Sequence, residues 1–153
     1  MMAIDNERVF AAVADERRHI ADLIDSLDNA QLATPSLCAG WDVKTVAAHL
    51  VSVFDDSFWV FMGTAARRRS MSGAIDELAR RRARLPAAEI ADTLRPRAEH
   101  RLSPPLFGPT DPLADILVHG GDMRIPLGLP FHPQAELAAP GVPARKWPVP
   151  PPP

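Results

Sequence analysis

The sequence lacks the features that would place the chain in a membrane or in an oxidising compartment. It has one cysteine, Cys38, which cannot form a disulfide within the chain. No uninterrupted apolar run approaches the ~20 residues that a membrane-spanning helix requires. The first residues, MMAIDNERVF, lack the basic and then apolar pattern of a secretory signal. We therefore expect a soluble protein with the cytoplasm as its location.

An excess of charge of one sign is also missing. The chain has 17 Lys and Arg against 19 Asp and Glu, a formal net charge of -2, so nothing global favours nucleic acid or an anionic membrane as partner. One stretch is locally rich in arginine, but neighbouring positions on a helix point in different directions and acidic residues flank them. This pattern predicts a solvated face with local ion pairs. The arginines are Arg67, Arg68, Arg69, Arg80, Arg81, Arg82 and Arg84.

Proline is the one residue type in clear excess. The sequence has 17 prolines, and those of the last part of the chain lie in a segment without sustained apolar periodicity that ends in PVPPPP. Such composition is typical of an extended or disordered chain. The remaining length suits one domain with a hydrophobic core. We therefore predict a helical domain over residues 1–130 and a proline-rich tail over residues 131–153.

The first half of the chain has the apolar spacing of two helices. Over residues 4–27, apolar residues recur at intervals of three and four with charged residues between them, which predicts an amphipathic helix. Residues 28–40 read as a loop. Asp42 can then cap a second helix over residues 43–62, which Gly63 would end.

The second half predicts two further helical regions. Residues 74–102 form one region, broken or kinked at Pro86 and disturbed at Pro96, because proline removes a backbone hydrogen bond. The pair Asp111–Pro112 is a cap followed by proline at the first helical position, and Pro126 stops the helix that starts there. Four helical regions without an alternating strand pattern or an internal repeat predict an all-α four-helix bundle.

The last predicted helix carries a polar stripe. Asp115, His119 and Asp122 stand at positions i, i+4 and i+7, which lie nearly above one another on a helix. Asp115 and His119 could both reach one metal ion from this face. The spacing fits equally well a second interpretation, in which the helix dipole favours Asp115 and an exposed pair joins His119 to Asp122.

His49 in the second predicted helix changes the meaning of this stripe. Taken alone, a histidine on an apolar face is usually a buried residue satisfied by one hydrogen bond. A carboxylate and two imidazoles from two helices would, however, form a three-ligand site open to water or substrate, as catalytic metals have. These ligands fit zinc without excluding nickel or iron. Asp122 could be a further ligand, a partner of Arg124 or, our preferred reading, an acceptor for an imidazole N–H.

Two residues before the second predicted helix have alternative roles. Cys38 precedes a capped helix N-terminus, where a thiolate would be favoured. A lone cysteine without an identifiable base beside it is nevertheless more often a small buried residue. Trp41 is expected to pack at the head of the helix, although an aromatic ring near the mouth of a bundle can also line a pocket.

Two segments resemble the paired signatures of one family. TPSLCAGWDVKTVAAHL is similar to the first signature of the mycothiol-dependent maleylpyruvate isomerase N-terminal domain, and DILVHGGDMRIPLGLP is similar to the second. The resemblance covers about residues 5–130 and implies a DinB-like four-helix bundle. It also implies a divalent metal, usually zinc, held by His49, Asp115 and His119. The acidic position is commonly glutamate in the isomerase itself, so Asp115 has a shorter reach.

The resemblance further implies a chemistry. The metal lowers the pKa of the thiol of a small cofactor such as mycothiol, and the thiolate adds to an electrophilic carbon, either to isomerise a double bond or to leave a thioether. Cys38 is then not needed as nucleophile. The isomerase carries an additional C-terminal domain that 153 residues cannot hold, so maleylpyruvate is not implied as the substrate. The alternative is a non-catalytic binding or homodimerisation module with a degenerate metal site.

Overall fold

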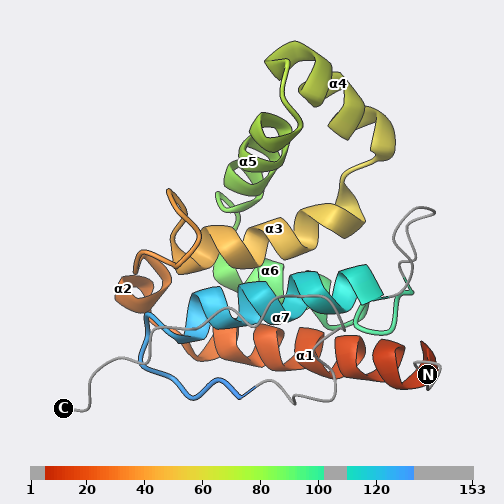
Figure 1. The fold of residues 1–153 in the computed structure, drawn as a ribbon. Helices are drawn as coiled ribbons and strands as arrows, with labels where there is room; N and C mark the ends of the chain where they lie inside the picture. The colour runs from red at the N-terminus through yellow and green to blue at the C-terminus, as the bar shows by residue number, and fades with distance from the viewer. Residues whose placement is uncertain (1–5, 102–109, 133–153) are drawn as a thin grey trace.

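The computed structural model of the chain describes residues 6–101 and 110–132 (Figure 1). These two ranges contain seven helices and no strand, apart from an isolated bridge between Pro35 and Asp42. The predicted all-α class is confirmed. Residues 133–153 of the predicted tail lie outside the described residues. None of the helices in the described ranges is long and apolar enough to cross a bilayer.

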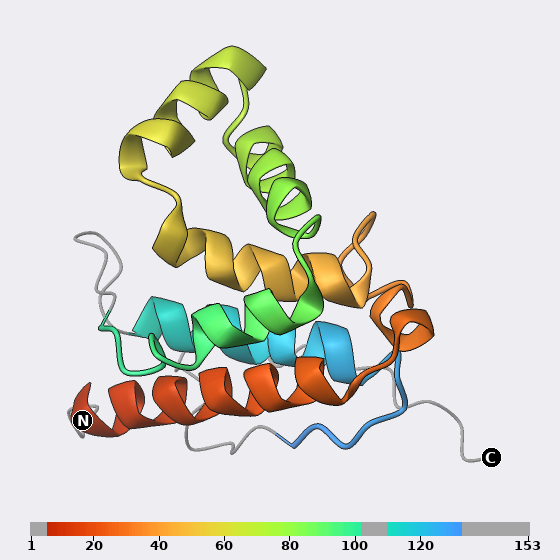
Figure 2. The same cartoon turned by 180° about the vertical axis from the view of Figure 1, so that it is seen from behind.

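Four helices form a bundle: α1 (Asn6–Ser26), α3 (Val43–Asp55), α6 (Ala87–Leu94) and α7 (Thr110–Arg124). Both α1 and α3 pack against α6 and α7, so the four helices surround one core, as Figures 1 and 2 show from opposite sides. The apolar stripe that predicted α1 faces this core. The largest fully buried side chains of the core are Ile20, Ile24, Val43, Val46, Val51, Ile90, Leu94, Leu113 and Met123.

A helical hairpin projects from the bundle (Figure 1). It consists of α4 (Phe58–Arg68) and α5 (Met71–Arg82), which pack against each other while α5 also contacts α3. Arg69 joins them with a left-handed backbone, at a φ of 52°. The Ser70 hydroxyl caps α5 by accepting the N–H of Gly73 at 3.0 Å, so α5 begins three residues before the predicted Ala74.

The prediction of one helix over residues 43–62 is wrong. The helix breaks at Asp56, whose backbone is extended, and the Ser57 hydroxyl accepts the N–H of Val60 at 3.2 Å to start α4. Gly63 lies inside α4 and does not end it. Arg82, the last residue of α5, stabilises this break, because its guanidinium donates to the Asp55 carboxylate at 2.9 Å.

For the region predicted over residues 74–102, the break at Pro86 is confirmed, but the predicted extent of the helices is wrong. α5 ends at Arg82, and Pro86 precedes the first residue of α6, as expected for a proline at a helix start. α6 ends at Leu94 and not at residue 102, and turns follow over residues 95–99. The reason is Pro96, which has no N–H and restricts the residue before it.

The loop predicted for residues 28–40 contains a short helix, α2 (Asn29–Leu32). Asp28 and Gln31 form a reciprocal capping box, with distances of 2.8 and 2.9 Å between each side chain and the other residue's backbone N–H. The predicted cap of α3 is confirmed, because Asp42 Oδ1 accepts the N–H of Thr45 at 2.7 Å. The predicted start of α7 is wrong by two residues, because the helix begins at Thr110, and Asp111 and Pro112 lie inside its first turn. Its end at Arg124, two residues before Pro126, is close to the predicted end.

Candidate metal centre

The three predicted metal ligands lie together between α3 and α7. His49 comes from α3, and Asp115 and His119 come from consecutive turns of α7. Each offers one ligand atom, and these atoms lie within 4.8 Å of one another. His119 Nε2 is 3.4 Å from Asp115 Oδ1, and the two imidazole centroids are 5.0 Å apart. Two imidazoles and one carboxylate are the donor set of a divalent transition metal.

One ring nitrogen of His49, the buried Nδ1, is without a hydrogen bond among the described residues. The usual explanation of a core histidine, one nitrogen satisfied by a hydrogen bond, therefore does not hold for this nitrogen. Burial lowers the pKa of His49, although nearby Asp115 acts to raise it, which favours the neutral ring that metals bind. These residues fit a divalent metal ion.

Asp122 lies beneath His119 and is only 3% exposed. Its Oδ2 is 3.1 Å from His119 Nδ1, so the imidazole N–H donates to this carboxylate while Nε2 points to Asp115. The pair is therefore largely shielded from water, with 14% of the His119 side chain exposed, and is not the exposed surface pair of the alternative interpretation. Arg124 instead binds Glu16 on α1. A carboxylate in this place fixes the tautomer and the direction of a ligating histidine.

The two α7 ligands form a charged pair. Burial acts to lower the pKa of His119, but hydrogen bonds to Asp115 and Asp122 raise it to about 9. Burial acts to raise the pKa of Asp115, but its hydrogen bond to His119 and the nearby positive charges lower it overall. A proton on His119 thus sits where positive charge is strongly stabilised. A metal cation would replace this proton.

A buried arginine near the site was not predicted from the sequence. Arg17 of α1 is 4% exposed and donates to the backbone oxygens of Ala98 and His100 at 2.9 and 2.7 Å. Its guanidinium lies 4.6 Å from the centre of the Phe54 ring. Burial lowers the pKa of Arg17 to about 10, while Asp115 acts to raise it. The only signal in the sequence was an arginine within the apolar stripe of α1.

Trp41 packs at the head of α3, as predicted. It packs against the hydrophobic core at the head of α3, and its ring centroid lies 5.2 Å from that of His49 and 6.4 Å from that of His119. Its ring therefore lies beside both histidines of the candidate site. Cys38 is half-buried against the same core and is not one of the three clustered ligands. This agrees with a packing role for Cys38.

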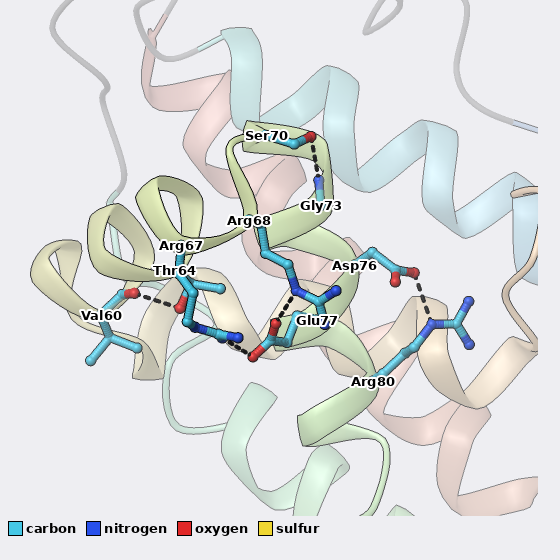
Figure 3. A network of polar contacts seen from close by, with 9 residues as sticks. All are labelled: Val60, Thr64, Arg67, Arg68, Ser70, Gly73, Asp76, Glu77 and Arg80. Atoms are coloured by element: carbon cyan, nitrogen blue, oxygen red, sulfur yellow. Dashed lines mark hydrogen bonds and ion pairs between the residues drawn. The ribbon is translucent and has the colours of Figure 1, made fainter.

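The arginine-rich stretch forms local ion pairs, as predicted. Arg67 and Arg68 of α4 both bind Glu77 of α5, and Arg80 donates to Asp76 at 2.9 Å (Figure 3). These pairs join α4 to α5 and join successive turns of α5. Three of the arginines are thus paired within the hairpin, and Arg82 pairs instead with Asp55 and Asp56 at the end of α3.

Comparison with known proteins gives one match. Residues 13–121, well over half of the chain, match the family model of the mycothiol maleylpyruvate isomerase N-terminal domain. The matched range contains His49, Asp115 and His119 and ends one residue before Asp122. No curated protein and no solved structure matches the chain.

Proposed function

The chain belongs to the mycothiol maleylpyruvate isomerase N-terminal domain family, and from this premise we propose that it is a divalent-metal-dependent enzyme using a low-molecular-weight thiol. Mycothiol is the proposed thiol, and the reaction is a transfer or isomerisation on a small electrophilic substrate. The observation that carries this proposal is that one ligand atom each of His49, Asp115 and His119 lie within 4.8 Å of one another. Zinc suits these ligands best, with nickel and iron as the other metals to test.

The metal would supply one chemical effect, a lowered thiol pKa, so that the cosubstrate is a thiolate near neutral pH. The protein's own residues prepare the place for this. Asp122 holds the ring of His119, and burial keeps His49 neutral. Asp115 is the one charged group among the three proposed ligands, so a divalent cation with these ligands would carry net positive charge to attract the thiolate.

The thiolate would then add to an electrophilic carbon of the second substrate. A carbon–sulfur bond forms, and the electron pair of the attacked double bond moves to a conjugated carbonyl. If the thiol leaves again after rotation, the product is an isomer; if a proton adds to carbon, the product is a thioether. The half-buried wall formed by Trp41 would limit water around the sulfur.

The direct test is the metal content of protein purified without chelator. We expect about one metal ion per chain, lost in His49→Ala and in His119→Ala. His19→Ala is the matched control, because His19 lies on α1 with 66% of its side chain exposed and should leave the metal in place. Absence of metal from the unmutated protein, even after zinc is supplied, would overturn the proposal. Thiol consumption with mycothiol and a panel of electrophiles then measures activity.

One observation favours a second candidate function, a binding or homodimerisation module. Phe58 and Trp59 of α4 are 65% and 79% exposed, which is unusual for large aromatic side chains on a projecting hairpin. For a module of this kind, Trp59→Ser would change the oligomeric state, measured by sedimentation. Metal bound without thiol consumption with any electrophile would favour this candidate over the enzyme.

A further inference from the structure

The loop that carries Trp41 comprises residues 33–42, between α2 and α3. It is tied to the candidate metal centre from one side. Ser36 closes the loop, because both its N–H and its hydroxyl donate to the carbonyl of Trp41 at 2.9 Å. The N–H of Leu37 donates to the carbonyl of Asp122 at 3.1 Å. The loop therefore rests on α7 at the residue that holds the ring of His119.

The other side of the loop is tied to α5 of the hairpin. The indole N–H of Trp41 donates to Asp76 Oδ1 at 2.7 Å, and Arg80 Nε donates to the same oxygen at 2.9 Å. Arg80 also donates through Nη2 to the carbonyl of Gly40 at 2.8 Å. Gly40 has a φ of 81°, which favours glycine there. Asp76 and Arg80 together thus fix both the backbone before Trp41 and its ring.

The ring held in this way borders both histidines of the site, with centroids 5.2 Å from His49 and 6.4 Å from His119. We propose that Asp76 is a positioning residue of the metal centre: by accepting the indole N–H it holds Trp41 as a fixed wall, against which a thiol at the metal packs. This inference rests on the proposed function. It adds that the hairpin, which contributes no ligand, determines the shape of the thiol site.

α5 offers a matched control beside Asp76. Glu77 is the next residue, and Figure 3 shows it turned toward Arg67 and Arg68 while Asp76 turns toward Arg80. Both are partly exposed carboxylates of the same helix that pair with arginine. Of these two carboxylates, Asp76 accepts the indole N–H of Trp41 and Glu77 pairs with Arg67 and Arg68, so Glu77→Ala reports the general effect of losing an ion pair in the hairpin.

The first measurement uses metal-free protein and follows the indole N–H groups by nitrogen-15 NMR. Trp41→Phe identifies the Trp41 signal among the three tryptophans of the chain. Asp76→Ala should shift that signal and speed its exchange with water. Asp76→Asn, whose amide oxygen can still accept the N–H, should restore much of the original behaviour.

The second measurement uses cobalt-loaded protein with 2-mercaptoethanol as the thiol probe, followed by the sulfur-to-cobalt absorption band. Asp76→Ala should raise the Kd of the probe about fivefold, as for the loss of one hydrogen bond. Metal stoichiometry and the cobalt d–d bands should stay unchanged, because no ligand is altered. In the Trp41→Phe background, Asp76→Ala should cause no further rise, since the bond it removes is already gone.

The outcomes separate the two ideas. An unchanged probe Kd in Asp76→Ala, or an equal rise in Glu77→Ala, overturns the positioning role and leaves the proposed function standing. Failure of the unmutated protein to bind cobalt or zinc overturns both. A raised Kd in Asp76→Ala that Asp76→Asn reverses, with metal retained, is the result expected.

Discussion

The hydrogen bond between Asp122 and His119 makes a quantitative prediction about metal affinity. Asp122→Asn replaces a carboxylate by an amide of nearly the same size, so the backbone and the packing of α7 should persist. The amide oxygen can still accept the N–H of His119 Nδ1, but the negative charge beneath the imidazole is lost. The variant therefore isolates the electrostatic contribution of Asp122 to the ligand.

The structure sets the size of this effect. Asp122 is 3% exposed and its Oδ2 lies 3.1 Å from His119 Nδ1, so water screens the interaction little. A hydrogen bond to a charged group contributes about 1.5–3 kcal/mol, and loss of a carboxylate behind a ligating histidine costs about 10–100-fold in metal affinity. We expect zinc to bind about 10–100-fold more weakly to Asp122→Asn.

The assay is competition for zinc with a chromophoric chelator at fixed pH. Asp92→Asn is the control, because the Asp92 side chain is 76% exposed and lies on α6. A zinc affinity within threefold of the unmutated protein would show that Asp122 does not tune His119. Complete loss of zinc with altered cobalt d–d bands would instead assign Asp122 as a direct ligand.

Three further predictions concern the metal-free protein and its packing. The pKa of His119 is raised from its ordinary 6.5 to about 9. The protonated ring therefore stabilises the metal-free fold by a free energy of the order of 3 kcal/mol below pH 6.5. This contribution is lost as the pH rises through 9. Thermal unfolding in chelator should show this decline and His119→Gln should abolish it; a flat profile would refute the assignment. Gly121→Ala would place a Cβ 2.8 Å from the Phe131 ring and should lower the free energy of unfolding in urea by about 1–3 kcal/mol. Phe131→Ala should restore part of this loss, and an unchanged stability of Gly121→Ala would contradict the close packing. Arg17→Ala should cost about 3 kcal/mol in urea, because two carbonyls lose their donor; a loss below about 1 kcal/mol would show that water replaces the guanidinium.

Much of the fold could be read from local sequence. The apolar stripe of α1, the cap at Asp42 and the end of α7 before Pro126 each depend on residues within one or two helical turns. The capping box of Asp28 and Gln31 is equally local, but the apolar pattern predicts a loop there. The i, i+4 spacing of Asp115 and His119 likewise fixed that they share one face of α7. These features need no knowledge of distant parts of the chain.

The breaks between helices were harder to predict. Apolar residues lie on both sides of Asp55, Asp56 and Ser57, so periodicity alone continues the helix past Asp56, although Ser57 is a local cap for α4. The break is stabilised by Arg82, which comes from a helix 26 positions later in the chain and bonds to both Asp55 and Asp56. The contribution of Arg82 comes from a contact between distant residues, which leaves no local pattern from which it could be inferred.

In the candidate site, too, some features follow from local sequence and others only from contacts between distant parts of the chain. The sequence by itself determined the residue types that could hold a metal, their spacing on α7 and the resemblance to one family. Tertiary structure decided that His49 lies within 4.8 Å of them, that the pair of His119 and Asp122 is largely shielded from water, and that Asp76 bonds to Trp41 beside the histidines. The physical reason is that helical periodicity places side chains on a face, while only the packing of α3, α5 and α7 decides which faces meet.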